Sequence, residues 1–328
     1  MNQLKSIINV KPVVIAVIDS GISNELLLSN TLVIEKITLT EKGTVWGNAV
    51  DEHGHGTAIA GMLSEFCGNS IELIIIKILN ENCRSTSIQM IKAIEMAIEM
   101  KPDIINMSLG TEDFTYKGDL VRLCNLAQLN DILITTTTSK NNISTLPYIL
   151  EGTIKVLTHS QLRNDKYLYS DHIDRFYTLG AAHIVPWKNG RIVFINQNSF
   201  ATPYFIKEFI LIKKNEGFKS NYDACNALLT KCKNISNIEN NIINKEMPIN
   251  RLIFNEIIQI VRRNYKDFNE SHNSFIQDLD SKFCVELLQV IKNEFAYEIP
   301  VSYFNIYDFE YISNLSNKID AILNGTIN

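Results

Sequence analysis

Residues 13–22 read VVIAVIDSGI, a run of β-branched residues that ends abruptly at Asp19-Ser20-Gly21. Such a run predicts a strand buried on both faces, as the central strands of a parallel sheet are. Further apolar runs predict four more strands, at residues 73–79, 104–107, 132–137 and 153–157, with helical patterns at 87–100 and 119–130 between them. This alternation predicts a doubly wound α/β fold with a parallel sheet, whose ligand-handling residues lie at the carboxyl ends of the strands.

The composition changes after residue 234. Residues 235–249 lie in an asparagine-rich stretch that includes a proline, and we interpret them as a linker. Beyond them, helical periodicity at 252–265, 282–295 and 309–323 predicts a small all-α bundle. The sequence therefore indicates a first domain of residues 1–234 and a second of residues 250–328.

Bulk properties exclude several classes of protein. The formal net charge is -5 and we find no basic stripe, which argues against nucleic-acid binding. No apolar run approaches the ~20 residues that span a bilayer. The six cysteines show no metal or redox spacing, and no signal-peptide cleavage site precedes the first strand. We therefore expect no metal, no membrane and a cytoplasmic location.

Three polar groups stand where nucleophilic catalysis would need them. Asp19 follows the first predicted strand, and His55 lies between glycines in DEHGHGTAIAG, residues 51–61. Ser199 opens a predicted helix in NQNSFATPYF, residues 196–205. A serine hydroxyl becomes a nucleophile when an imidazole takes its proton, and the imidazole needs a carboxylate to hold its tautomer. We interpret Asp19, His55 and Ser199 as a candidate triad.

These stretches resemble the signature blocks of the subtilisin-like (S8) serine peptidases, in the chain order Asp…His…Ser. The resemblance covers roughly residues 10–234. It implies a subtilisin-like fold, with Asp19, His55 and Ser199 catalytic. It also implies that Ser108, Leu109 and Gly110 bind substrate, because they match the Ser-Leu-Gly segment of the family.

Some positions depart from the family pattern. Gln197 and Asn198 replace the usual Gly-Thr before the serine. The side-chain oxyanion donor falls on Ser139 in an ungapped alignment, or on Asn141 if the loop is longer. Losing such a donor typically costs about 3–4 kcal/mol of transition-state stabilisation. His53 is a second candidate base, but the flanking glycines favour His55.

The C-terminal segment resembles acyl or peptidyl carrier proteins. In that family a 4'-phosphopantetheine arm is attached to the serine of an Asp-Ser-Leu motif, which implies attachment at Ser281. Asp278 replaces the usual glycine and Lys282 the usual leucine. The alternative is that Ser281 simply caps a helix.

Together these features favour an intracellular serine endopeptidase that processes a dedicated biosynthetic peptide, by leader removal or by maturation of a carrier-linked peptide. Its partners would be a peptide or protein substrate, biosynthetic enzymes and a phosphopantetheinyl transferase. A degenerate peptidase fold that binds peptides as a scaffold is the alternative. Housekeeping proteolysis is a third possibility.

Overall fold

The computed structural model describes residues 11–26, 28, 30–138, 145–159, 162, 169–172, 174–179, 182–234, 250–264, 281–295, 299–309 and 311–325. The side chains of residues 169, 171, 172, 234 and 281 lie outside the description.

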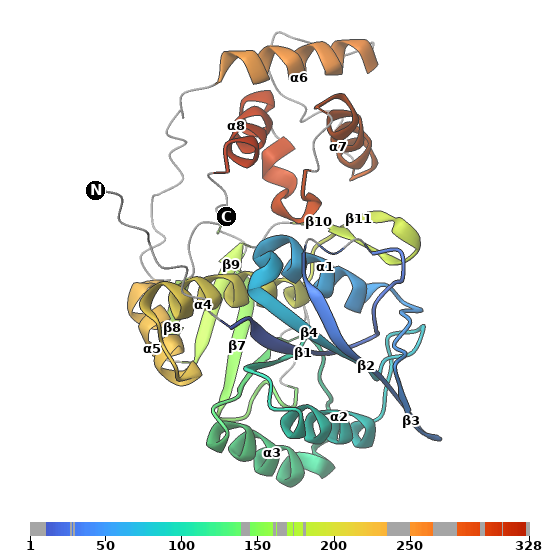
Figure 1. The fold of residues 1–328 in the computed structure, drawn as a ribbon, viewed down its shortest axis with the longest axis vertical. Coiled ribbons are helices and arrows are strands. Elements are labelled where there is room, and N and C mark those ends of the chain that lie inside the picture. Colours follow the sequence, from blue (N-terminus) through green and yellow to red (C-terminus); the bar gives the residue numbers. More distant parts are fainter. Residues whose placement is uncertain are drawn as a thin grey trace, which may run out of the picture.

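A ten-stranded sheet forms the centre of the molecule (Figure 1), in the order β12-β8-β9-β7-β6-β5-β1-β4-β2-β3. Its inner strands run parallel, whereas β3 pairs antiparallel with β2, and β8 pairs antiparallel with β9. In chain order the strands are β1 (Val13–Asp19), β2 (Leu32–Thr40), β3 (Gly43–Trp46), β4 (Ile71–Lys77), β5 (Ile104–Met107), β6 (Leu133–Thr136), β7 (Thr153–His159), β8 (Tyr169–His172), β9 (Arg175–Leu179) and β12 (Lys233–Asn234). A separate hairpin pairs β10 (His183–Pro186) with β11 (Ile192–Ile195).

Strand β1 shows why the sheet needs such apolar strands. Ile15 and Val17 belong to the apolar core on one face of the sheet, whereas Ala16 and Ile18 belong to the core on the other face. All residues of β1 except the partly exposed Val14 are therefore buried, and no polar alternation remains. All five predicted strands are present. The strands β2 and β3 were not predicted, because exposed and charged residues interrupt their apolar pattern.

Helices cover both faces of the sheet. Helices α2 (Ser87–Glu99) and α3 (Lys117–Leu129) pack on one face. Helices α1 (His55–Cys67), α4 (Thr202–Glu216) and α5 (Asn221–Lys231) pack on the other. The layered arrangement confirms the predicted α/β class (Figure 1).

The C-terminal segment contains helices α6 (Arg251–Asn264), α7 (Ser281–Phe295) and α8 (Ile312–Leu323), close to the three predicted ranges. They lie above α1 and the β10–β11 hairpin in Figure 1. Their buried residues, including Ile257 and Leu287, belong to the same apolar cluster as Phe205 of α4. The carrier-protein likeness of this segment stays a prediction.

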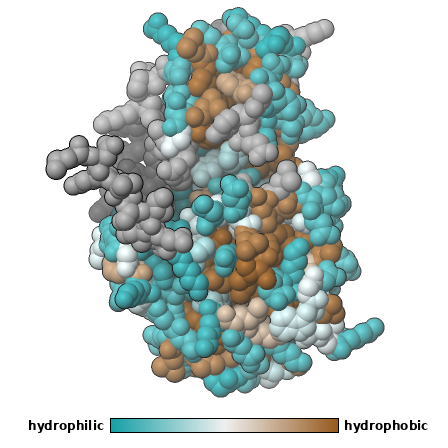
Figure 2. Space-filling view, in the orientation of Figure 1, coloured by the Kyte–Doolittle hydropathy of each residue, from teal (hydrophilic) through white to brown (hydrophobic). Residues whose placement is uncertain are grey.

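The surface is mixed in character. Figure 2 shows apolar side chains gathered near the middle of the visible face and again among the C-terminal helices. Exposed large apolar residues include Leu32 and Ile34 of β2. None of the helices in the described ranges is long and apolar enough to cross a membrane.

Candidate active site

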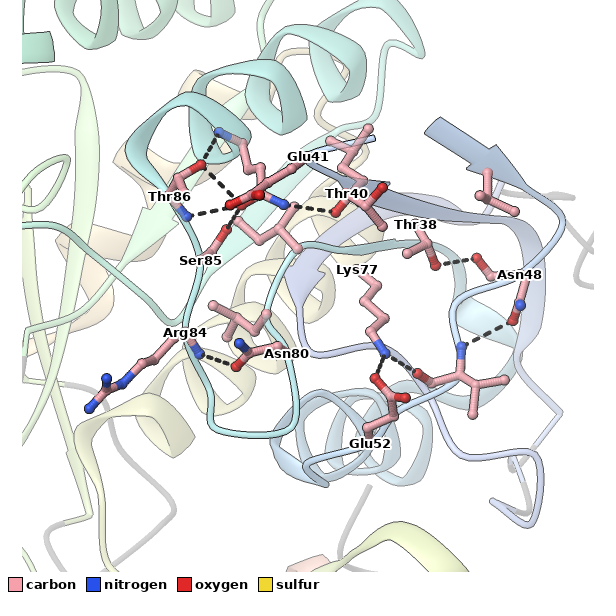
Figure 3. Close-up of a pocket in the computed structure, with 16 residues that line it drawn as sticks. Thr38, Thr40, Glu41, Asn48, Glu52, Lys77, Asn80, Arg84, Ser85 and Thr86 are labelled. Atoms are coloured by element: carbon pink, nitrogen blue, oxygen red, sulfur yellow. Dashed lines mark hydrogen bonds and ion pairs between the residues drawn. The ribbon is translucent and has the colours of Figure 1, made fainter. Parts of the chain in front are cut away.

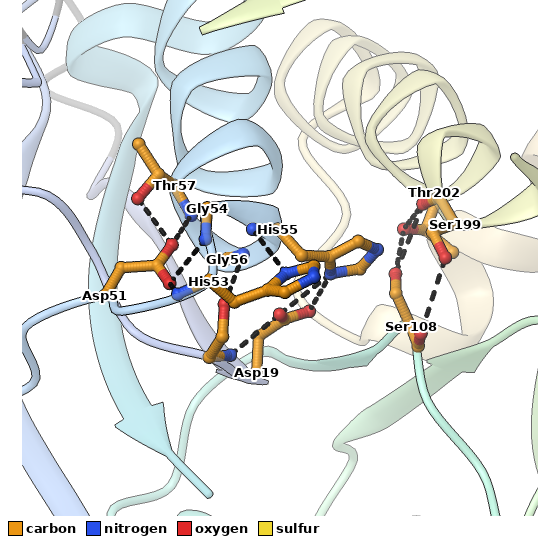
Figure 4. Close-up of polar contacts among 11 residues, drawn as sticks. Asp19, Asp51, His53, Gly54, His55, Gly56, Thr57, Ser108, Ser199 and Thr202 are labelled. Atoms are coloured by element: carbon orange, nitrogen blue, oxygen red, sulfur yellow. Dashed lines mark hydrogen bonds and ion pairs between the residues drawn. The ribbon is translucent and has the colours of Figure 1, made fainter. Parts of the chain in front are cut away.

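The predicted acid and base meet at the carboxyl end of the sheet. Asp19 is the last residue of β1, and His55 is the first residue of α1. The Nδ1 atom of His55 lies 2.8 Å from Oδ1 and 2.9 Å from Oδ2 of Asp19 (Figure 4). Both side chains are almost fully buried. A buried carboxylate held against Nδ1 leaves Nε2 of the imidazole as the nitrogen that can accept a proton.

Two glycines allow this close approach. Gly54 precedes α1 with a φ of 119°, a conformation that side chains rarely adopt. A Cβ on Gly56 would lie 2.3 Å from the carbonyl oxygen of Gly21, so a side chain there would push the helix away from β1. The glycines flanking His55 are therefore required by the backbone of the site.

Asp51 is a functional residue that the sequence analysis missed. Its Oδ1 accepts hydrogen bonds from the backbone N–H groups of His53 (2.9 Å) and Gly54 (2.7 Å). Its Oδ2 accepts from the backbone N–H (2.9 Å) and the hydroxyl (2.6 Å) of Thr57. Asp51 thus satisfies the otherwise unpaired N–H groups at the start of α1. An Asp just before a helix start was the available signal.

Thr57 does not cap α1. Thr57 lies inside the first turn of α1, where its hydroxyl donates to Asp51 and accepts from the backbone N–H of Ser23. Gly54 occupies the N-cap position and makes no side-chain bond.

We expect Asp51→Asn to lower the free energy of unfolding by about 1–3 kcal/mol, because an amide has one accepting oxygen and its NH2 group cannot accept from the two donors that faced the other carboxylate oxygen. Burial raises the pKa of Asp51, but the hydrogen bonds from Thr57 and Gly54 outweigh it and leave the pKa below its ordinary value. A lowered folded-state pKa stabilises the protein above the unfolded pKa, and this stabilisation is lost as the pH falls through the folded-state pKa. Urea denaturation at pH 7 and below pH ~4 measures this effect. The difference in free energy of unfolding between the unaltered chain and Asp51→Asn should be smaller in acid. Equal stability at pH 7 would contradict the assignment.

The electrostatics distinguish the two histidines. Burial lowers the pKa of His55, but the charge of Asp19 and its hydrogen bond outweigh burial, so the pKa of His55 is raised above 6.5. Burial and then the neighbouring His55 lower the pKa of His53. The half-exposed His53 accepts, through Nδ1, a bond from the backbone N–H of His55 at 3.3 Å. Within the described residues, the carboxylate of Asp19 contacts the ring nitrogen of His55 and not that of His53.

A general base works only when it is neutral. Because the pKa of His55 is raised above 6.5, the reactivity of Ser199 should rise with pH and reach half its maximum above pH 6.5. The rate of fluorophosphonate labelling between pH 5 and 9 measures this midpoint. A midpoint below 6.5 would show that Asp19 does not stabilise the imidazolium.

Ser199 lies in the short 3₁₀ helix Asn198–Ala201 that leads into α4. The ring of the next residue, Phe200, lies 5.5 Å from that of His55, which places the base beside the serine segment. The Ser199 hydroxyl donates to the carbonyl oxygen of Ser108 at 3.4 Å. Among the described contacts no hydrogen bond joins Ser199 to His55. A bond as long as 3.4 Å is weak, and catalytic hydrogen bonds often form only when substrate is bound.

The substitutions before Ser199 fit the backbone. Gln197 is extended, with a φ of -142°, so the position does not need glycine. Asn198 joins three segments: its Oδ1 accepts from the Thr158 hydroxyl at 2.5 Å, and its Nδ2 donates to the carbonyl oxygen of Thr138 at 3.1 Å. Asn198 therefore ties the nucleophile segment to the ends of β6 and β7. Its role was not visible in the sequence, because all its partners are distant along the chain.

The predicted substrate-binding segment lies against the nucleophile. Ser108 directly follows β5, and its hydroxyl donates to the carbonyl oxygen of Ser199 at 3.2 Å (Figure 4). Leu109 is half-buried and Gly110 is exposed. A Cβ on Gly110 would lie 2.7 Å from the hydroxyl oxygen of Thr145, so only glycine fits there without a shift. Substrate binding by these three residues stays a prediction.

Three predicted site residues cannot be placed in full. Ser139 and Asn141, the two candidate oxyanion donors, lie outside the described residues. Ser281 is the first residue of α7, but its side chain lies outside them too. In the described ranges no group of three His, Cys, Asp or Glu side chains is arranged to hold a metal ion.

A cavity of about 590 Å³ opens beside the site, between the β2–β3 hairpin and the segment after β4 (Figure 3). Lys77 lines it and donates to Glu52 and to the carbonyl oxygen of Val50, both at 2.7 Å. Ile78, which also lines the cavity, donates its backbone N–H to the carbonyl oxygen of Asp19. Lys77 and Glu52 form an ion pair in the cavity wall.

Comparison with known proteins agrees with this geometry. Residues 11–149, which include Asp19 and His55, match the model of the subtilase family. This stretch of the chain is similar to subtilases. None of the curated proteins compared with it matches. The match to the family model ends before Ser199; in the structure the ring of Phe200, the residue after Ser199, lies 5.5 Å from the ring of His55.

Solved structures of serine proteases share this fold. The nisin leader peptidase NisP from Lactococcus lactis is 20% identical, with a TM-score of 0.56 over 66% of this chain and 81% of that one. The epidermin leader peptide processing serine protease EpiP from Staphylococcus aureus is 15% identical, with a TM-score of 0.55 over 66% and 68%. A cold-adapted subtilisin-like serine proteinase is 17% identical, with a TM-score of 0.52 over 66% and 81%. The subtilase fold predicted from the three sequence blocks is confirmed.

Proposed function

We propose that this chain is a serine endopeptidase whose triad is Asp19, His55 and Ser199. The observation that carries the proposal is the buried pair of Asp19 and His55, whose ring packs against the residue next to Ser199. A surface histidine would gain little from such a carboxylate. In a buried site the carboxylate holds one tautomer and stabilises the imidazolium that forms during the reaction.

The mechanism follows from these positions. Substrate binding brings the Ser199 hydroxyl from the Ser108 carbonyl oxygen to Nε2 of His55, which takes the proton as Oγ attacks the scissile carbonyl carbon. The resulting imidazolium then protonates the leaving amine, and an acyl group remains on Oγ. Water, activated by the same imidazole, releases the acyl group and restores the serine. The side-chain donor to the oxyanion would come from Ser139 or Asn141.

We propose a peptide of a biosynthetic route as the substrate, cleaved to remove a leader or to mature a carrier-linked chain. Two of the solved structures that share this fold are leader peptidases of nisin and epidermin. Biosynthetic enzymes are the partners that such a role requires. Incubating the purified chain with candidate precursor peptides and measuring the product masses identifies the cleaved bond. General cleavage of casein would instead favour housekeeping proteolysis.

Fluorophosphonate labelling tests the activity directly, because the reagent reacts with an activated serine. We expect the purified full chain to gain one label, and peptide mapping should place it on Ser199. A Ser199→Ala chain should not be labelled, whereas Ser302→Ala, which removes the hydroxyl of another buried serine, should keep the label. A folded chain that takes no label would favour the alternative, a peptide-binding scaffold with unchanged affinity in Ser199→Ala.

We further propose 4'-phosphopantetheine on Ser281 as a second, separate feature. Ser281 begins α7, and a helix N-terminus favours a phosphate group. Lys282 beside it is exposed, so the start of the helix is open to a modifying transferase. When bound, the arm would carry an acyl or peptidyl group as a thioester. Intact mass after co-expression with a phosphopantetheinyl transferase tests it: an added mass of about 340 Da, absent in Ser281→Ala, supports the modification.

A further inference from the structure

Residues 299–306, here called the strap, connect the C-terminal helices α7 and α8. Its residues Ile299, Val301, Ser302, Tyr303, Phe304 and Asn305 are all buried, each less than 9% exposed. Burial of this extent is unusual for a connection between helices, because connecting segments normally run over the surface. The strap therefore has specific partners in the subtilase domain.

The first partner is the helix that begins with the base. The backbone N–H of Ser302 donates to Oε2 of Glu65 at 2.6 Å, and the Tyr303 hydroxyl donates to the carbonyl oxygen of Glu65 at 3.3 Å. The ring of Tyr303 also packs edge-on against Phe66, with 5.1 Å between the ring centres. Since His55 is the first residue of α1, these contacts hold the far end of the helix that carries the base.

The second partner is the helix that follows the nucleophile. The ring of Tyr204 in α4 lies 5.0 Å from Phe66. Lys207, one turn further along α4, places Nζ 5.7 Å from the ring of Phe66 and 5.4 Å from the ring of Tyr303. Tyr303 thus completes a cluster that joins α1 to α4, and the segment carrying Ser199 leads directly into α4.

The third partner is the hairpin that covers the histidine segment. The backbone N–H of Ile184 donates to the carbonyl oxygen of Phe304, and that of Ile306 donates to the carbonyl oxygen of Ala182, both at 3.1 Å. The turn of the same hairpin presses Trp187 onto Gly54, where a Cβ would lie 2.2 Å from the indole. Lys188 of that turn donates to the carbonyl oxygen of Glu52. The strap, the hairpin and the histidine segment therefore form one continuous contact.

We propose that the strap positions the catalytic base and nucleophile, with Glu65 and Tyr303 as its positioning residues, so that the C-terminal segment is a working part of the peptidase. The proposal rests on the proposed function for its effect on activity, but not for its effect on structure. Loosening the strap should let α1 and α4 move relative to each other. A small displacement between base and nucleophile lowers the rate of the chemical step more than it lowers substrate affinity.

Two variants test this in the full chain, each with a conservative partner. Glu65→Leu removes the acceptor of the Ser302 N–H, whereas Glu65→Gln keeps one. Tyr303→Leu removes the ring from the cluster, whereas Tyr303→Phe keeps it. Leu252→Ala is the matched control, because Leu252 belongs to the C-terminal segment but is 79% exposed.

The first measurement is hydrogen–deuterium exchange, which does not depend on activity. We expect Glu65→Leu and Tyr303→Leu to exchange at least about fivefold faster at residues 51–58 and 196–203 than the unaltered chain. The two conservative variants and Leu252→Ala should match the unaltered chain. Unchanged exchange at both catalytic segments in either folded disruptive variant would overturn the proposal, whatever the activity of the protein.

The second measurement is turnover of a peptide substrate. In Glu65→Leu and Tyr303→Leu we expect kcat to fall about tenfold or more, while KM changes by less than about threefold. In the conservative variants Glu65→Gln and Tyr303→Phe we expect kcat to return to that of the unaltered chain. A loss carried by KM alone would overturn the positioning role. If the strap variants exchange faster but the unaltered chain takes no label on Ser199, the proposed function fails and the structural role of the strap stands. If a leucine variant does not fold, the comparison rests on the other position.

Discussion

Replacing Ser199 or His55 by alanine is expected to lower kcat about 10⁶-fold in each case. The proton transfer and the nucleophilic attack form one step, so removing either group removes both. For the same reason the double variant should be no slower than either single variant. Rates with the best peptide substrate, measured at a pH where fluorophosphonate labelling of the unaltered chain has reached its plateau, give the comparison.

His53→Ala is the matched control for this experiment. His53 lies two residues from His55, but its ring is half-exposed and the carboxylate of Asp19 contacts His55 instead. We expect activity within about tenfold of the unaltered chain, since His53 contributes only a backbone hydrogen bond and its contact with Trp187. If His53→Ala were as inactive as His55→Ala while remaining folded, the base would have to be reassigned.

Replacing Phe205 by alanine is expected to lower the free energy of unfolding by about 3–5 kcal/mol. Phe205 is fully buried in α4, and its ring lies 4.8 Å from Phe176 of β9 and 6.3 Å from Phe209. Deleting the ring leaves a cavity between the helix and the sheet that the rigid surroundings cannot fill. A loss of this size is a large part of the 5–15 kcal/mol that stabilises a typical domain.

Chemical denaturation followed by far-ultraviolet circular dichroism measures this change. Leu211→Ala, on the same helix, is the control: Leu211 is 37% exposed, and we expect a loss below about 1 kcal/mol. Similar losses in the two variants would show that α4 is not anchored through Phe205. The Phe205→Ala variant also reports on the site, because α4 begins directly after the 3₁₀ helix that contains Ser199.

Much of the site was predictable because its residues lie in local patterns. Each pattern reflects the backbone at its position: an apolar run that stops at Asp19, glycines around His55, and a proline soon after Ser199. The structure brings Asp19 and His55 together as predicted. Asp51 was missed although its signal is local. The β2–β3 hairpin was missed because exposed strands carry little apolar periodicity.

The residues alone determined the subtilase fold and the three groups of the proposed triad, since burial on both faces of a strand and strained turns restrict which side chains a position accepts. The tertiary structure decided what joins distant parts of the chain. Asn198 gains its role from Thr138 and Thr158, and Tyr303 gains its role from Phe66 and Lys207. Such contacts leave no local pattern, because a polar or aromatic side chain looks the same in sequence whether its partner is solvent or a helix two hundred residues away.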